Sequence, residues 1–314
     1  MEITQGNLSA VFTGLRATFV EALDRIALPE DVERLIQLVP SVTSSEEYPT
    51  ALMLGDLEKV LDEVAYTNIA EFIQSVPNED FARAFAIKRA KIEDDQIGMY
   101  TPSIQRLARL AATHPHRRIP YLFVSSNGTA TGGAGGGFQT NWIDGTTVFS
   151  NTHAWPGGQA WDNLDALPLT ATNFGIVCQH LRQRLGPGGM SLGLRPTLLI
   201  VGPANEVNAK RILERTFVGG GNSNIWHNYV KLAVWDEISD LSWFVVDDSD
   251  VKPVALQNRT GPDWIAQDKL EDDSHFNRHE FRYQACRRYG IAVVCPWLIQ
   301  TVNWNEDSTT TTEA

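Results

Sequence analysis

The chain has 314 residues, of which 43% are hydrophobic and 20% charged, and its formal net charge at pH 7 is −12. This length and composition fit one large globular domain or two modest ones. The acidic balance argues against a dedicated nucleic-acid binder, which would carry a basic footprint, and no apolar window approaches the ~20 residues of a membrane-spanning helix.

The N-terminal part predicts one amphipathic helix and then a ribbon. A helix is expected over 7–23, where one apolar stripe recurs at helical spacing. This stripe must find a partner surface, in this chain or in another copy. A second short helix is expected at 30–38. Segments with strand character at 36–53 and 71–91 then predict a long two-stranded excursion, which is marginal alone in water and should lie on another surface.

The middle of the chain predicts a helix followed by a strand and a long loop. Residues 100–113 place Ile104, Leu107 and Leu110 on one helical face. We expect this face to pack on C-terminal strands near three large residues. These are Phe281, Tyr283 and Val293. YLFVSS at 121–126 reads as a strand, and the Gly-, Asn- and Trp-rich stretch 127–168 reads as a specialised loop.

The C-terminal half predicts alternating helices and strands. The expected elements are a helix at 170–185, a strand at 196–202, a helix at 203–215, a Gly/Asn loop at 217–226, strands at 229–235 and 242–247, and two strands within 279–302 joined near Tyr289–Gly290. The last residues, 303–314, are expected to form a flexible tail.

Ser191 lies in a sequence that matches the nucleophile elbow GxSxG of serine hydrolases, at 189–193. That elbow requires a strand directly before the serine and a helix directly after it. Here a glycine-rich helix end precedes the motif and a strand-like run follows, so a chance match is favoured. A serine hydrolase that uses Ser191 is kept as an alternative function, and we predict no catalytic residues.

Cofactor and metal motifs are equally weak. The glycines of 132–137 follow a predicted strand, but no GK[ST] follows them and the GxGxxG spacing fails. His275 and His279 have i,i+4 spacing but lack a helical context and a third ligand. The three cysteines form no CxxC pair. We therefore expect no cofactor, no metal ion and free thiols at Cys178, Cys286 and Cys295.

Three blocks of the chain resemble the Mu-like major head subunits of phages and prophages. The first is IEDDQIGMYTPSIQRLARLAA at 92–112, with an acidic pair, Gly, Tyr and Pro before a long helix. The second runs from Asp144–Gly145 through Phe149 to His153 and Pro156. The third, LGLRPTLLIVGPANEVNAKRILERT at 192–216, is the most specific. The resemblance covers roughly residues 1–235; the glycine-rich insert at 131–137 departs from the family pattern, and 236–302 matches more loosely.

The resemblance implies an α+β protein of the Hong Kong 97-type capsid fold. The implied parts are an N-terminal arm at 1–38, an E-loop hairpin at 39–92, a peripheral domain with the spine helix and a long loop at 93–164 and 266–302, an axial domain at 165–265, and the tail at 303–314. The 217–224 loop is expected to face a capsomer axis, where glycine can adapt to five- or six-fold crowding.

The implied function is that of a major capsid protein, which assembles into pentamers and hexamers of an icosahedral shell around double-stranded phage DNA. The implied partners are the protein itself, a scaffold protein, a portal, decoration proteins and packaged DNA through non-specific contacts, with no membrane. The implied location is the virion capsid, reached from the host cytoplasm. An encapsulin-like nanocompartment shell, with the same fold and a protein cargo, is the main alternative.

Charge is distributed unevenly over these implied parts. Between 46 and 80 nine acidic residues accompany the single base Lys59, a local charge of −8, whereas 101–118 holds four arginines and no acid. We expect the acidic E-loop of one subunit to lie across a basic surface of its neighbour. The predicted interface residues are Glu46, Glu47, Asp56, Glu58, Asp62, Glu63, Arg106, Arg109, Arg117, Arg118, Arg278 and Arg282.

Overall fold

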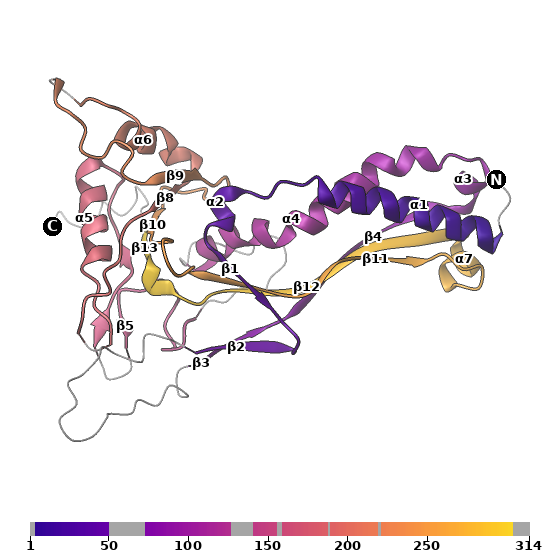
Figure 1. Ribbon diagram of the computed structural model, residues 1–314, viewed down its shortest axis with the longest axis horizontal. Coiled ribbons are helices and arrows are strands. Elements are labelled where there is room, and N and C mark those ends of the chain that lie inside the picture. Colours follow the sequence, from indigo (N-terminus) through magenta and orange to yellow (C-terminus); the bar gives the residue numbers. More distant parts are fainter. Residues whose placement is uncertain are drawn as a thin grey trace, which may run out of the picture.

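The computed structural model describes residues 4–49, 73–126, 141–155, 159–187, 189–218 and 221–303. The molecule is elongated, with a wide half at one end and a narrow half at the other (Figure 1). Each half is built around its own sheet, and the N-terminal end of the chain lies at the tip of the narrow half. None of the helices within these ranges is long and apolar enough to cross a membrane.

The narrow half consists of two helices laid over a four-stranded sheet (Figure 1). The helices are α1 (Gln5–Asp24) and α4 (Thr101–Ser126). The sheet order is β1 (Ile36–Pro40), β11 (Val254–Gln267), β12 (Glu280–Val293) and β4 (Glu79–Lys88). A short helix, α7 (Asp273–Arg278), joins β11 to β12.

The predicted amphipathic helix is confirmed by α1, and its partner surface is in the same chain. Leu8, Val11, Leu15 and Phe19 are buried in one cluster with residues of α4 and the sheet. The predicted spine-helix face is confirmed for Ile104 and Leu107, which pack in that cluster with Phe281 and Tyr283. Leu110 is only half-buried, and Val293 belongs to a different cluster.

The prediction of a strand at 121–126 is wrong, because these residues continue α4. The helix runs through Pro115 and Pro120 and reaches the wide half, where Leu122 and Phe123 are fully buried with Phe244 and Trp235. The end of this helix is surrounded by core on several sides and is therefore apolar all round. In the sequence, such a short apolar run has the same pattern as a buried strand.

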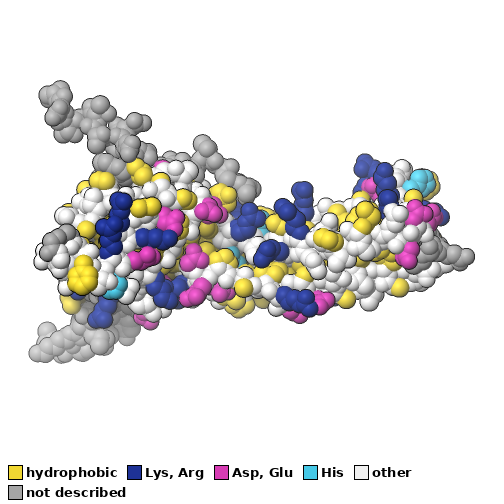
Figure 2. All heavy atoms as spheres, turned by 90° about the horizontal axis from the view of Figure 1, so that it is seen from above, with side chains coloured by type: hydrophobic (Ala, Val, Ile, Leu, Met, Phe, Trp, Pro, Cys, Tyr) yellow, Lys and Arg dark blue, Asp and Glu magenta, His cyan; other side chains and the backbone are white. Residues whose placement is uncertain are grey.

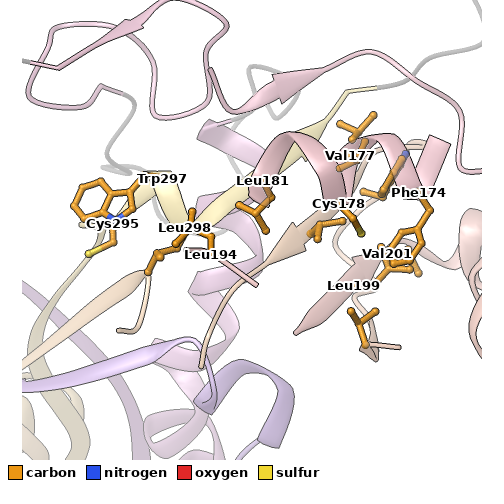
Figure 3. Close-up of a cluster of buried hydrophobic side chains, with 14 of the residues drawn as sticks. Phe174, Val177, Cys178, Leu181, Leu194, Leu199, Val201, Cys295, Trp297 and Leu298 are labelled. Carbon is orange, nitrogen blue, oxygen red and sulfur yellow. The ribbon is translucent and has the colours of Figure 1, made fainter. Parts of the chain in front are cut away.

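The wide half is a five-stranded sheet flanked by two helices (Figure 1). The sheet order is β7 (Leu164–Asp165), β13 (Ile299–Val302), β10 (Trp243–Val246), β8 (Leu198–Val201) and β9 (Lys231–Val234). The helices are α5 (Ala171–Arg182), whose N-terminus Thr170 caps, and α6 (Pro203–Leu213), which begins with its proline. Figure 3 shows Phe174, Val177 and Leu181 of α5 in the core with Leu199 and Val201 of β8.

Shorter elements complete the described chain. A two-stranded ribbon, β2 (Ser45–Pro49) with β3 (Ile73–Pro77), leads directly into β4. The others are α2 (Glu30–Glu33), α3 (Arg89–Glu93), β5 (His153–Ala154), β6 (Ala160–Trp161) and 3-10 turns at Ile97–Tyr100 and Pro296–Leu298. The helix expected at 30–38 therefore ends at Glu33, and β1 follows it.

The prediction of a joint at Tyr289–Gly290 is wrong, because β12 passes through both residues without turning. Gly290 allows a close approach: a Cβ atom there would lie 2.6 Å from Gln257 and from the Pro77 carbonyl. The sheets also divide the chain differently from the domain ranges implied by the resemblance. Most of β11 falls within 165–265 but pairs in the narrow sheet, whereas β13 falls within 266–302 but pairs in the wide one.

Candidate assembly interface

The exposed face of α4 carries a basic ridge, which we define as Arg106, Arg109 and Arg117. All three side chains are exposed. Because 11 residues make just over three helical turns, Arg106 and Arg117 point in nearly the same direction about 16 Å apart, and Arg109 lies between them along the helix. Figure 2, which looks down on this side of the molecule, shows Lys and Arg side chains spaced along the narrow half.

A groove of about 710 Å³ lies beside the ridge, between α1 and α4. Arg106 and Arg109 line it from α4, and Arg25 lines it from the end of α1. Glu21 also lines the groove, but it is paired with Arg25 at 2.5 Å. The groove therefore presents a net positive charge to any chain that enters it.

Three other predicted arginines are placed differently. Arg118 is buried: its guanidinium contacts Glu79 at 2.9 Å and lies 4.6 Å from the ring centre of Phe81. Arg282 is half-buried and pairs with Glu280 at 2.9 Å. Arg278, at the end of α7, is exposed. Arg118 is thus a support inside its own subunit, because α4 turns this position toward the sheet.

The two predicted acidic residues within the described chain, Glu46 and Glu47, have different surroundings. Glu46 organises the turn before β2: its carboxylate accepts hydrogen bonds from the Ser41 hydroxyl at 2.6 Å, the Thr43 hydroxyl at 2.9 Å and the Val42 amide at 3.1 Å. The Ser41 and Thr43 hydrogen bonds lower the pKa of Glu46 to about 2. Glu47 is exposed. Asp56, Glu58, Asp62 and Glu63 lie outside the described residues.

An apolar tip projects from the wide half beyond α6 (Figure 1). It belongs to the Gly/Asn segment predicted as a loop at 217–226, of which 217–218 and 221–226 are described. Phe217, Val218 and Ile225 expose 62%, 46% and 79% of their surface. Exposed apolar side chains gathered at a projection are typical of contact surfaces.

The surroundings of Ser191 do not form a nucleophile elbow. Ser191 lies in an exposed loop between α5 and β8, where its hydroxyl accepts a hydrogen bond from the Gly193 amide at 3.3 Å. A helix precedes this loop and a strand follows it, the reverse of the required order. The geometry therefore gives the hydrolase alternative no support.

His275 and His279 do not converge on a metal site. The segment is helical, contrary to our expectation, but His275 is buried with Nδ1 3.0 Å from the Leu270 carbonyl, and the rings of the two histidines lie 6.0 Å apart. No cluster of three metal-ligating side chains occurs in the described part of the chain.

Sequence reasoning missed a buried polar centre in the wide half. The guanidinium of Arg184 is fully buried and donates to the carbonyls of Trp297 at 2.5 Å, Ile299 at 3.2 Å and Asp162 at 2.6 Å, and to the Gln300 side chain. Burial lowers the pKa of Arg184 to about 10. An arginine at a helix end looks like any surface arginine in sequence, so no signal could have found it.

A second polar contact, between buried His153 and half-buried Asp144, supports the described parts of 141–163. His153 is fully buried, with Nδ1 2.6 Å from Asp144 and Nε2 3.2 Å from the Val148 carbonyl, and its ring stacks on Trp161 at 4.2 Å. Trp142, Trp155 and Trp161 pack around it. Burial tends to raise the pKa of Asp144, but hydrogen bonds from His153 and Thr146 lower it overall. All three tryptophans are core residues.

A family model described as "Mu-like prophage major head subunit gpT" matches residues 8–166, 160–238 and 234–308 of this chain. Among individual proteins, the major capsid protein of Escherichia phage Mu is 22% identical over 289 residues, which are 92% of this chain and 70% of that protein.

Solved capsid structures have a similar fold. A chain of the procapsid of bacteriophage JBD30 matches with a TM-score of 0.55 at 19% identity, covering 98% of this chain and 79% of that one. A chain of the capsid of an empty GTA particle matches with a TM-score of 0.54 at 13% identity, covering 89% and 92%.

Proposed function

This chain belongs to the Mu-like prophage major head subunit family, and from this premise we propose that it is the major capsid protein of a Mu-like phage head. The observation that carries the proposal is a family match over almost the whole length of the chain. The chain has the Hong Kong 97-type capsid fold, as the sequence predicted. A shell protein has no need of a catalytic centre, and the elongated shape gives each copy a large perimeter for contacts.

The shell is proposed to be icosahedral and built from pentamers and hexamers around double-stranded DNA. A scaffold protein, a portal and decoration proteins are its proposed partners, DNA contacts are non-specific, and assembly takes place in the host cytoplasm. The net charge of −12 supports a wall that surrounds DNA without binding it tightly.

The proposed peripheral and axial domains follow the two sheets. The arm is 1–38 and the E-loop is 39–92, of which β2 and β3 form the described base; α1, β1 and β4 lie within these ranges but pack in the narrow half. The narrow half is the peripheral domain with α4 as its spine. The wide half is the axial domain, and we propose that its apolar tip at 217–225 faces the capsomer axis. Compared with the ranges drawn from the sequence, β11 moves to the peripheral domain and β13 to the axial domain.

The acidic E-loop of one subunit is proposed to lie across the basic ridge of its neighbour. Between 46 and 80 the E-loop carries Asp56, Glu58, Asp62 and Glu63 with a single base, Lys59, and the ridge carries Arg106, Arg109 and Arg117. Single exposed ion pairs contribute only about 0–1 kcal/mol. A patch repeated at every contact can nevertheless set the register and orientation of subunits. Glu46, Arg118 and Arg282 are left out of this interface because each is engaged within its own subunit.

Electron microscopy of the purified protein, combined with analysis of particle contents, tests the proposed function. We expect closed shells, with DNA inside particles recovered from phage-producing cells. Shells filled with a cargo enzyme would instead identify an encapsulin-like nanocompartment. A protein that forms no assembly under any condition would contradict both shell functions.

A further inference from the structure

The helix α4 is interrupted at Pro115. Proline has no amide hydrogen, so the carbonyl of Ala111, four residues earlier, loses its normal helical donor, and the proline ring also strains the turn before it. Such breaks kink or end most helices. Here the helix continues to Ser126, so another group has to compensate for the missing donor.

Arg287 of β12 supplies the missing donor. Its Nη1 lies 3.4 Å from the Ala111 carbonyl oxygen and 3.3 Å from that of Ala112. The rest of the guanidinium contacts the Asn258 side chain on β11, with Nε at 3.4 Å and Nη2 at 3.3 Å. A side chain of the sheet thus takes the place of a main-chain amide of the helix, and Asn258 orients it.

The helix is tied to the sheet on both sides of the break. Before it, the Tyr289 hydroxyl lies 2.6 Å from Nδ1 of His114. After it, Arg118 pairs with Glu79, the first residue of β4, at 2.9 Å and covers the ring of Phe81. Phe81 in turn stacks on Tyr289 with ring centres 4.6 Å apart. His114 is thus held mainly by Tyr289 and Arg118 mainly by Glu79, and Phe81 of β4, the strand that continues the ribbon, contacts both.

We propose that Pro115 is a hinge in α4 and that Arg287 is the side chain that holds this hinge closed. Opening the hinge breaks no main-chain hydrogen bond at position 115, so the helix can bend there without unfolding either segment. Bending releases the contacts of Arg287 with the two carbonyls and shifts the buried side chains beside the break, such as Ile119, against the sheet.

The ribbon of β2 and β3 is connected to the hinge in α4 through β4. Glu79 follows Pro77, the last residue of β3, by two positions, so a displacement of β2 and β3 reaches Arg118 and the second segment of α4 through the ion pair with Glu79 and the contact with Phe81. A subunit whose ribbon is seated on a neighbour and a subunit whose ribbon is free would then differ in the bend of α4. This inference goes beyond the proposed function, because it concerns the conformations of a single subunit and is testable on the protein as purified, in shells or free.

The energetic coupling between Arg287 and Pro115 is the first test. Hydrogen exchange of the amides at 116–119 is measured in Arg287→Gln, Pro115→Ala and the double variant. Arg287→Gln is expected to speed exchange there tenfold or more. Pro115→Ala should cancel that effect to within about twofold, because an alanine at this position returns an amide donor to the Ala111 carbonyl.

Arg288→Gln is the matched control, since Arg288 lies on the same strand but pairs with Asp80 at 3.4 Å. It should leave 116–119 unchanged. Exchange that is unchanged in Arg287→Gln, or that stays fast when Pro115→Ala is added, would overturn the proposal. If Arg287→Gln yields no folded protein, recovery of soluble protein in the double variant supports the coupling, and failure to recover it counts against it.

The bend itself is the second test. Spin labels at Arg106→Cys and Tyr121→Cys, with Cys286→Ser, report a distance of about 22 Å along an unbroken helix. In particles with few labelled subunits, the chain with Pro115 should give a broad or two-component distance distribution, and Pro115→Ala a single narrow one. Equally narrow distributions in both would show that Pro115 is no hinge.

Discussion

The wide and narrow halves of this protein satisfy their polar and apolar groups in different ways. In the wide half, β8, β10 and β13 are buried along their whole length, and even a guanidinium is enclosed by carbonyls of the same half. In the narrow half the helices cover one face of the sheet, while the basic ridge, the groove beside it and the β4 edge face outward within the described chain. The wide half thus buries most of its sheet and exposes an apolar tip, whereas the narrow half exposes a charged surface that we propose is covered by neighbouring subunits.

The largest effect is expected in the wide half, from Arg184→Met. The substitution leaves the Trp297, Ile299 and Asp162 carbonyls and Gln300 without their shared donor. Each buried acceptor left without a donor costs about 1–3 kcal/mol, and several acceptors are affected here. Urea unfolding should show this loss, whereas Arg182→Met, two residues earlier and exposed, should change stability by less than about 0.5 kcal/mol. Equal effects of the two variants would contradict the described core.

Leu107→Ala is the corresponding change in the narrow half. It removes a side chain that packs with Ile104, Phe281 and Tyr283, and truncation of a buried leucine costs about 2–5 kcal/mol. We expect a value near the lower end, because the cluster borders an open groove at Leu107. Thermal melting and shell yield should both fall. Arg106→Ala, one residue away and exposed, is the control for melting and should leave it unchanged.

The pH dependence of local stability should also differ between the wide and narrow halves. Burial, and then the charges of Arg118, Arg117 and Arg287, lower the pKa of His114, and burial and Arg287 lower that of His116. Neutral histidines therefore contribute stability that is present above their ordinary pKa of about 6.5 and is lost as pH falls through the lowered values. Tyr289 and Glu79 also face this cluster.

Hydrogen exchange between pH 7 and pH 5, corrected for the intrinsic rate, checks this prediction. Protection around 111–119 should decrease before protection of β8 and β10 does. His114→Gln should weaken the dependence. Uniform loss of protection in both halves would contradict it.

The smallest effect on the fold is expected from reversing the ridge charges. The double variant Arg106→Glu with Arg109→Glu should have a free energy of unfolding within about 1 kcal/mol of the wild type, since both side chains are exposed. Assembly should nevertheless be blocked, and lysines at Glu58 and Asp62 should partly restore it. In the wild type, assembly should slow with added salt, because attraction is screened over about 8 Å at physiological ionic strength. Normal assembly of the double reversal would remove the electrostatic account.

The sequence predicted best where one local pattern determines one structure. The stripe of α1 and the face of Ile104 and Leu107 follow helical spacing, and Pro203 marks the start of α6. The prediction of a strand at 121–126 failed because a helix end enclosed by core has no polar side, so its sequence shows no helical period. At Tyr289–Gly290 the glycine permits a close contact with β3 rather than a turn, and only the assembled sheet reveals that contact.

Most of the polar arrangement could not be predicted, because it depends on partners far apart in the sequence. Arg118 and Arg117 are neighbours with the same charge, yet one is buried against Glu79 and the other is exposed. The geometry of α4 decides between them. The role of Arg287 likewise cannot be predicted from the sequence, because its contact with the Ala111 carbonyl forms only when β12 packs against α4 at Pro115.

The dependence of the narrow half on neighbours is tested most directly by imaging the purified wild-type protein by electron cryo-microscopy. The account predicts closed shells or capsomers in which the ridge of Arg106, Arg109 and Arg117 is covered by an adjacent subunit, while the wide halves gather at the symmetry axes. A monodisperse monomer, or shells in which the ridge faces solvent and the wide halves lie away from every axis, would contradict it.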